Sequence, residues 1–190
     1  MIKNLLDHLD DSSPAFRCYA AGDAGGEFTV SIHHQRNRPA TADDLQTLKR
    51  SLGDIAGAFA ALYSIHDGLS MYVDPDERTV GLRFFSIAEW SERTRYMLEA
   101  FGDMGYGADE LVTGARDALV FAEIPASANY FTVKLVGPQR GCIFYIEHDD
   151  FEEEPFAESF EEFVARLVSD PAKLLDDAGC YTRYHDCLLY

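Results

Sequence analysis

Basic residues are scarce in this chain. Only 16 Lys and Arg stand against 33 Asp and Glu, which gives a formal net charge of −17. Nucleic-acid binding takes most of its affinity from cations placed on phosphates, so this balance argues against it. It argues equally against binding to an anionic membrane surface. A negative field speeds encounter with a basic partner, and it also keeps a protein soluble, so both explanations stay open.

Long hydrophobic runs are absent as well. No stretch approaches the ~20 apolar residues of a membrane span. Residues 1–11 are acidic and have no apolar core, which predicts that they are not a signal peptide. With no export signal, we expect a cytoplasmic protein whose scattered cysteines are reduced. These cysteines are Cys18, Cys142, Cys180 and Cys187.

The sequence also lacks the common catalytic and cofactor-binding motifs. It contains no GxGxxG, GxxxxGK[ST], GxSxG or HExxH pattern, so we predict no cofactor, no resident metal, no catalytic residue and no enzymatic activity. The chain has 190 residues and contains no Ser/Gly-rich or Pro-rich linker, which predicts a single domain over residues 1–190.

Three predicted helices begin at capping boxes, in which a Ser or Thr precedes an acidic residue by three positions. An apolar stripe at helical spacing follows the first box and predicts one long helix over residues 42–62. The other boxes open helices at residues 86 and 159. Two shorter helices are predicted near 110–118 and from Asp170-Pro171 through Leu175.

Predicted strands alternate with these helices. Residues 28–32 alternate apolar and polar side chains, and residues 70–73 and 79–85 flank a Pro/Asp turn, which indicates a hairpin. Three β-branched and aromatic runs follow at 119–124, 131–136 and 142–146. Because hairpins outnumber crossovers, we predict an α+β fold with a mainly antiparallel sheet.

An acidic run at residues 147–154 directly follows the last predicted strand. Residues 141–190 hold 13 acids and three bases, so the negative charge gathers at this end of the chain. The run suits a patch for a basic protein, a site for a hard cation, or a solvated loop. It lacks the central glycine and alternating ligands of a calcium loop. The candidate partner-binding residues are Asp67, Glu147, Asp149, Asp150, Glu152, Glu153 and Glu154.

Two His-Asp pairs offer an alternative, a metal-dependent hydrolase. His66-Asp67 and His148-Asp149 provide imidazole and carboxylate groups that bind zinc or iron, if their two loops meet. Both pairs lie in predicted loops, where His-Asp is also ordinary turn chemistry. Cys142 lies in an apolar strand, which favours a buried, unreactive thiol over a nucleophile.

Five segments, taken in order, resemble the SUKH superfamily, which includes yeast cell-wall-synthesis regulators and many bacterial immunity proteins. They are LYSIHDG at 62–68, FFSIAEW at 84–90, NYFTVKL at 129–135, GCIFYIEHD at 141–149 and FAESFEEFVARL at 156–167. The resemblance covers roughly residues 45–170. Residues 1–44 would be an N-terminal extension with one strand, and residues 171–190 a C-terminal tail.

The resemblance implies an α+β fold with a central, mainly antiparallel twisted sheet, helices packed around it, and no catalysis. Gly68, Gly141 and Ser159 match the family as structural positions, and Asp67 stands where the family most often has Asn. Bacterial members commonly bind toxins, often nucleases. The leading hypothesis is therefore a cytoplasmic immunity protein that neutralises a basic toxin, with the hydrolase and a regulatory scaffold domain as alternatives.

Overall fold

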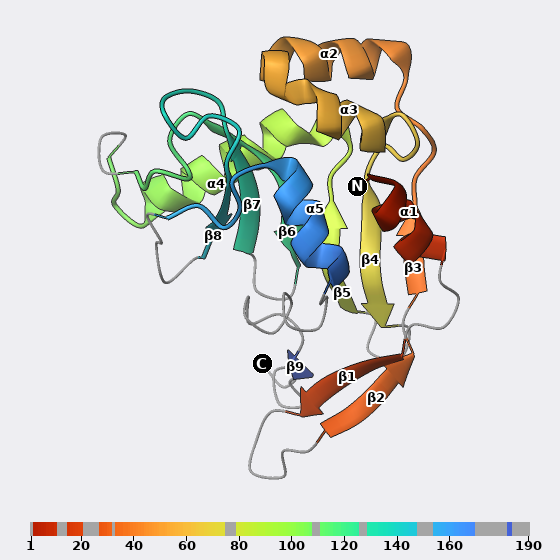
Figure 1. The fold of residues 1–190 in the computed structure, drawn as a ribbon. Helices are drawn as coiled ribbons and strands as arrows, with labels where there is room; N and C mark the ends of the chain where they lie inside the picture. The colour runs from red at the N-terminus through yellow and green to blue at the C-terminus, as the bar shows by residue number, and fades with distance from the viewer. Residues whose placement is uncertain are drawn as a thin grey trace.

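A six-stranded sheet lies at the centre of the protein, with its strands in the order β3-β4-β5-β6-β7-β8 and every neighbouring pair antiparallel (Figure 1). The strands are β3 (His33–Arg36), β4 (Leu69–Asp74), β5 (Thr79–Phe84), β6 (Ala118–Ile124), β7 (Asn129–Lys134) and β8 (Ile143–Ile146). The computed structural model describes residues 2–10, 15–20, 27–31, 33–74, 79–107, 111–125, 129–147, 154–169 and 182–183.

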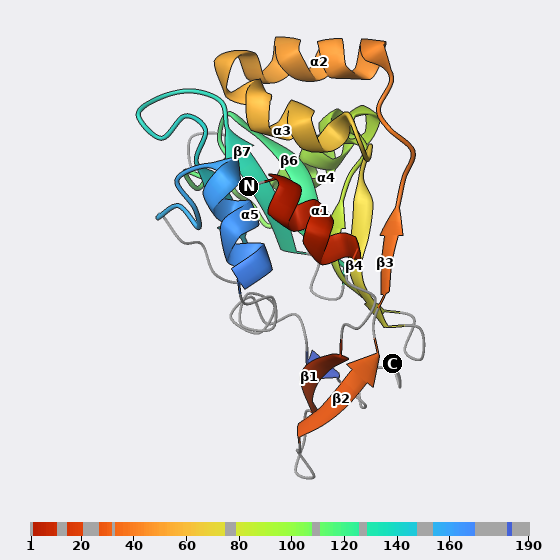
Figure 2. The same ribbon diagram turned by 45° about the vertical axis from the view of Figure 1, so that its right-hand side comes forward.

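Helices cover both faces of this sheet. Helices α1, α3 and α5 contact one another on one face, and α4 packs on β6 from the other (Figures 1 and 2). The helices are α1 (Ile2–Asp10), α2 (Ala42–Leu52), α3 (Ala56–Tyr63), α4 (Trp90–Asp103) and α5 (Phe160–Ser169), with short 3-10 turns η1 (Gly53–Ile55) and η2 (Ile87–Glu89). The predicted α+β class and antiparallel sheet are confirmed.

The helix expected over residues 42–62 is two helices. Gly53 has a φ of +65°, a left-handed conformation that ends α2 and that glycine adopts at low cost. Arg140 donates a hydrogen bond of 2.7 Å to the carbonyl of Leu52 at the same point. Leu52 and Phe59 are both buried, because the apolar stripe continues across the break. The prediction of one continuous helix is therefore wrong, although its buried face is right.

The first 44 residues contribute to the core. Leu5 and Leu9 of α1 are buried in the main hydrophobic cluster, and β3 forms an edge of the central sheet. A second sheet joins β1 (Ala15–Ala20), β2 (Glu27–Ser31) and β9 (Thr182–Arg183). The strand predicted at 28–32 is β2, and it pairs with β1 instead of the central sheet. Neither α1 nor β3 was predicted.

The helix expected near 110–118 is not formed by the residues described there, 111–118. They make turns and lead directly into β6. The loop is held by β7, since Thr132 donates 2.6 Å to the carbonyl of Gly114 and Lys134 donates 2.8 Å to that of Thr113. These two side chains of β7 thus satisfy carbonyls that would accept backbone hydrogen bonds in a helix. The helix predicted through Leu175 lies outside the described residues.

Aromatic rings fill the space between α3, α5 and the sheet. Phe59 stacks on Phe160, with ring centroids 3.9 Å apart, and Phe121 meets Phe59 and Phe163 edge to face at 5.4 and 5.5 Å. These are favourable aromatic geometries. The cluster fixes the start of α5 against α3. In the part of the chain that the structure describes, no helix is both long and apolar enough to cross a membrane.

Candidate partner-binding surface

The segment that leads into α5 is attached to the edge of the central sheet. Ile143 of β8 and Ala157 exchange two backbone hydrogen bonds, of 2.8 and 3.1 Å. Ala157 is also buried. The acidic residues on either side of Ala157 therefore extend from a backbone that is fixed in place.

One acidic residue in the first turn of α5, Glu162, stabilises the start of the helix itself. Ser159 accepts a hydrogen bond of 3.1 Å from the backbone N–H of Glu162, as the predicted capping box requires. The return bond differs, because the Glu162 carboxylate accepts 2.8 Å from the N–H of Glu158 instead of Ser159. This bond and the nearby Arg166 guanidinium lower the pKa of Glu162. Glu162 is thus committed to the helix.

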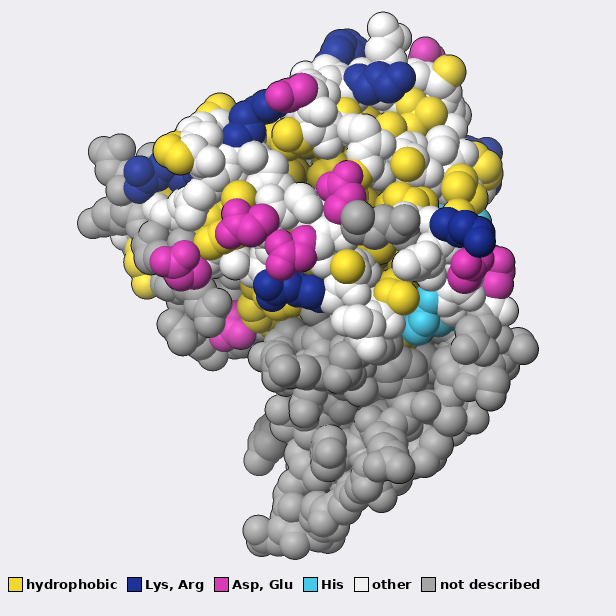
Figure 3. Space-filling model, in the orientation of Figure 1, with side chains coloured by type: hydrophobic (Ala, Val, Ile, Leu, Met, Phe, Trp, Pro, Cys, Tyr) yellow, Lys and Arg dark blue, Asp and Glu magenta, His cyan; other side chains and the backbone are white. Residues whose placement is uncertain are grey.

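Three further acids remain at the surface around this turn, and we call Glu154, Glu158 and Glu161 the acidic surface. Glu154 and Glu158 are exposed and Glu161 is half-buried. Figure 3 shows acidic side chains gathered on the face that α5 presents in this view. The Sγ of Cys142 lies 3.5 Å from a carboxylate oxygen of Glu158 and donates to it.

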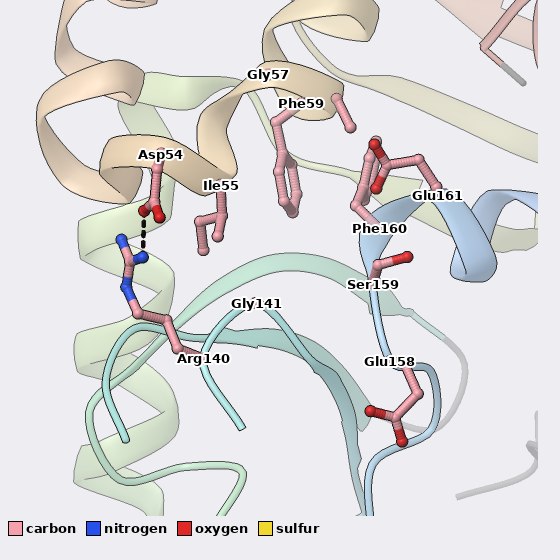
Figure 4. Close-up of a pocket in the computed structure, with 11 residues that line it drawn as sticks. Asp54, Ile55, Gly57, Phe59, Arg140, Gly141, Glu158, Ser159, Phe160 and Glu161 are labelled. Atoms are coloured by element: carbon pink, nitrogen blue, oxygen red, sulfur yellow. Dashed lines mark hydrogen bonds and ion pairs between the residues drawn. The ribbon is translucent and has the colours of Figure 1, made fainter. Parts of the chain in front are cut away.

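A hollow of about 240 Å³ lies beside the acidic surface, where three segments distant in sequence meet (Figure 4). The η1–α3 junction, the β7–β8 turn and the start of α5 each provide part of its wall. In Figure 4 the Asp54–Arg140 pair bounds one side of the hollow and Glu158 lies toward the other. The lining residues are Asp54, Ile55, Gly57, Ala58, Phe59, Arg140, Gly141, Glu158, Ser159, Phe160 and Glu161.

Arg140, the one basic residue in this lining, is already engaged. Its guanidinium donates to the carbonyls of Leu135 and Leu52, at 2.8 and 2.7 Å, and forms an ion pair with Asp54. The same ion pair lowers the pKa of Asp54. Arg140 thus joins the β7–β8 turn to the end of α2, and its charge is balanced by Asp54. The charge left over at the hollow is negative.

The structure describes three of the seven candidate residues, Asp67, Glu147 and Glu154. They lie against different elements: Glu154 precedes α5, Glu147 lines a second hollow beside α4, and Asp67 follows α3. Asp149, Asp150, Glu152 and Glu153 lie outside the described residues. The structure therefore does not bring these three acids into one cluster.

Asp67 serves the turn that follows α3. Its carboxylate accepts a hydrogen bond of 2.9 Å from the N–H of Ile87, and its own N–H donates 2.8 Å to the carbonyl of Arg38. Burial raises the pKa of Asp67, with the Ile87 bond opposing that shift. Through its carboxylate and its backbone N–H, Asp67 connects the turn after α3 to Ile87 and to Arg38, and this local role accounts for its position without a partner.

Glu147 borders a smaller hollow of about 140 Å³ on the α4 face of the sheet. Apart from Glu147, this hollow is lined mainly by apolar side chains of α4 and of the strand ends. The other lining residues are Met97, Ala100, Phe101, Met104, Tyr130 and Ile146. Glu147 thus faces surroundings unlike those of the acidic surface.

The hydrolase alternative finds no support in its described half. His66 forms a hydrogen bond of 3.1 Å through Nδ1 to the carbonyl of Asn37, so this ring serves the same turn as Asp67. His148 and Asp149 lie outside the described residues. Among the residues that are described, no three His, Cys, Asp or Glu side chains are grouped to hold a metal ion. Cys142 is a buried free thiol whose pKa is raised to about 11 by burial, as expected for an unreactive cysteine.

Sequence reasoning missed four residues of the hollow and its rim. Glu158 and Glu161 were not among the predicted site residues, although their positions next to the predicted N-cap imply exposure. Asp54 and Arg140 are 86 residues apart and carry no local motif. Only the packed fold brings their side chains together.

Comparison with known proteins gives one family. A family model described as SMI1 / KNR4 family (SUKH-1) matches residues 39–166. The matched region includes every residue that lines the larger hollow. A search of the curated proteins finds no match.

Proposed function

Because the chain belongs to the SMI1 / KNR4 family (SUKH-1), we propose that it is a non-enzymatic binding protein of the immunity type, which neutralises a basic toxin by direct contact. The family is generally non-enzymatic, and membership of it supports a role in protein–protein interaction. We further propose that the protein acts in the cytoplasm, where a toxin with an intracellular target would have to be intercepted.

The acidic surface is the observation that carries this proposal. Glu154, Glu158 and Glu161 lie on a segment bonded to the sheet, in a chain with a net charge of −17. Toxins that act on nucleic acid need basic surfaces to hold phosphates, so a fixed negative surface is complementary to them. The mechanism we propose is occlusion of that basic surface.

The remaining candidate acids enter the proposal in two ways. Asp149, Asp150, Glu152 and Glu153 precede Glu154 in sequence, and we propose that they extend the acidic surface. Glu147 would border this extension. We propose that Asp67 contributes indirectly, by holding the turn after α3, because its carboxylate is already bonded to Ile87.

The test has two stages. First, the tagged protein captures its partner from the native cell at low salt, and mass spectrometry identifies the partner. The purified partner is then titrated calorimetrically from low to high salt, and its toxic activity is assayed with and without this protein. We expect a basic toxin domain, inhibition of its activity, and affinity that falls steeply with salt.

A matched pair of variants localises the effect. The triple variant Glu154→Gln, Glu158→Gln and Glu161→Gln removes three charges from the acidic surface. The control, Glu92→Gln, Glu99→Gln and Asp103→Asn, removes three from α4 on the opposite face. The variant of the acidic surface should weaken binding by about tenfold, because each exposed ion pair contributes roughly 0.5 kcal/mol, and the α4 control should not weaken it. Equal losses of affinity in both variants would show that the acidic surface is not the binding site. Capture of a housekeeping protein would favour the scaffold alternative.

A further inference from the structure

We propose that the larger hollow is a socket for a single lysine or arginine side chain of the partner. The inference rests on the proposed function for the nature of that partner, but it names a contact that family membership does not.

The size and floor of the hollow suit a long side chain with an apolar stem. An apolar cavity of ~150 Å³ is enough to hold benzene, and this hollow measures about 240 Å³. Ile55 and Ala58 line it, together with the stacked rings of Phe59 and Phe160. Lysine and arginine lay their methylene stems along such apolar surfaces.

The charge of the hollow selects a cation. Arg140 is balanced by Asp54 and also bonded to two backbone carbonyls, so its guanidinium is unsuited to a new anion. Glu158 and Glu161 then leave the rim negative. An acidic side chain would be repelled here, whereas an ammonium or guanidinium group would gain one or two charge-assisted hydrogen bonds.

Gly57 of α3 lines the hollow and adds no side chain to it. A Cβ placed on Gly57 of α3 would meet nothing within 4 Å, although the residue lies in the lining. A Cβ placed on Gly102 of α4, on the opposite face of the sheet, would also meet nothing within 4 Å. Gly57→Leu would fill the hollow without changing its charge, and Gly102→Leu is the matched control for adding a leucine to a helix.

The test uses a small probe instead of the partner. The uniformly ¹⁵N-labelled protein is titrated with the blocked peptide acetyl-Gly-Arg-Gly-amide at low salt, and amide shifts are followed by NMR. A parallel titration uses the same peptide with citrulline, which has the shape of arginine without its charge. We expect saturable shifts centred on Gly57, Gly141 and Ser159 with the arginine peptide, and no saturation with the citrulline peptide.

The variants then test separately the negative charge of the hollow and its open volume. Glu158→Gln combined with Glu161→Gln should weaken arginine-peptide binding about fivefold, and Gly57→Leu should abolish it, while Gly102→Leu leaves it unchanged. A dispersed amide spectrum confirms that each variant is folded. Shifts that spread over all acidic residues, or equal binding by Gly57→Leu, would overturn the socket. A partner that binds with strong salt dependence while the arginine peptide does not bind would overturn the socket alone and leave the proposed function standing.

Discussion

The hydroxyl of Thr94 accepts a hydrogen bond of 2.9 Å from the backbone N–H of Val120. Thr94 lies on α4, and Val120 lies on β6 where the pairing with β7 shifts by one residue. The hydroxyl also donates 2.7 Å to the carbonyl of Trp90. A helix side chain therefore satisfies the buried strand N–H at this irregularity, in place of a neighbouring strand.

Replacing Thr94 with valine should lower the free energy of unfolding by about 1–3 kcal/mol, because it leaves the buried Val120 N–H without an acceptor. Valine has nearly the same shape, so little of this loss comes from packing. Chemical denaturation monitored by circular dichroism measures it. Thr94→Ser keeps the hydroxyl and is the control. A loss from serine as large as that from valine would show that the methyl group matters instead.

His34 should make the stability of the protein depend on pH. Its Nδ1 accepts from the N–H of Tyr72 at 3.3 Å, its Nε2 is buried without a partner among the described residues, and burial lowers the pKa of His34 to about 4. His8, Arg36 and His33 lie nearby and oppose protonation further. Since the ordinary pKa is 6.5, the unfolded chain binds the proton first as pH falls.

The stability that neutral His34 provides is therefore complete above about pH 6.5 and is lost as pH falls from 6.5 toward 4. The loss should be about 1–2 kcal/mol, less than the full shift implies because the ring is partly solvated. His34→Asn keeps an acceptor near the Nδ1 position but does not titrate in this range. Unfolding curves collected at several pH values should show a smaller slope for the variant between pH 6.5 and 4. Parallel slopes would contradict the role of His34.

Two glycines four residues apart should respond oppositely to alanine. Gly57→Ala should raise the free energy of unfolding by about 0.5–1 kcal/mol, because the residue is helical and a Cβ there meets open space. Gly53→Ala should lower it by about 1–2 kcal/mol, since Gly53 has positive φ and its Cβ would lie 3.0 Å from Arg140 Nη2. Thermal melting of both variants distinguishes the signs, and two shifts in the same direction would refute the break between α2 and α3.

Asp67 should tolerate asparagine but not alanine. Asparagine keeps an oxygen that can accept from the N–H of Ile87, and it removes a charge whose pKa is raised by burial and by Asp44 and Glu89. We expect Asp67→Asn to change stability by less than about 0.5 kcal/mol, and Asp67→Ala to lose about 1 kcal/mol with the hydrogen bond. Denaturation of both variants gives the comparison. An equal loss in both would mean that the charge itself is needed.

The strands of the central sheet were predictable where their patterns are local. The apolar runs at 119–124 and 142–146 correspond to β6 and β8, and the hairpin around 75–78 to β4 and β5, because alternation and turn residues act over short distances. Helix α1 was not predicted, because the burial of its two leucines depends on packing against α5 and α3, which are distant in sequence.

Features built by contacts distant in sequence were beyond prediction. The apolar stripe across residues 52–59 gave no sign of the break at Gly53, where a side chain 88 residues away meets the end of α2. The hollow has the same origin, because Asp54, Arg140 and Glu158 belong to segments that share no motif. The acidity of the 147–162 region was visible in composition, but its geometry depends on the attachment of Ala157 to β8.

That attachment also protects the sheet. β8 is an outer strand of the six, and exposed strand edges invite pairing with other chains. Residue 157 occupies both backbone hydrogen-bonding groups of Ile143 on its outer side, so a foreign strand would first have to displace the segment that carries Glu154 and Glu158. The residues that we propose to attract a basic partner thus also obstruct edge-to-edge association, and their negative charges repel identical copies of the chain.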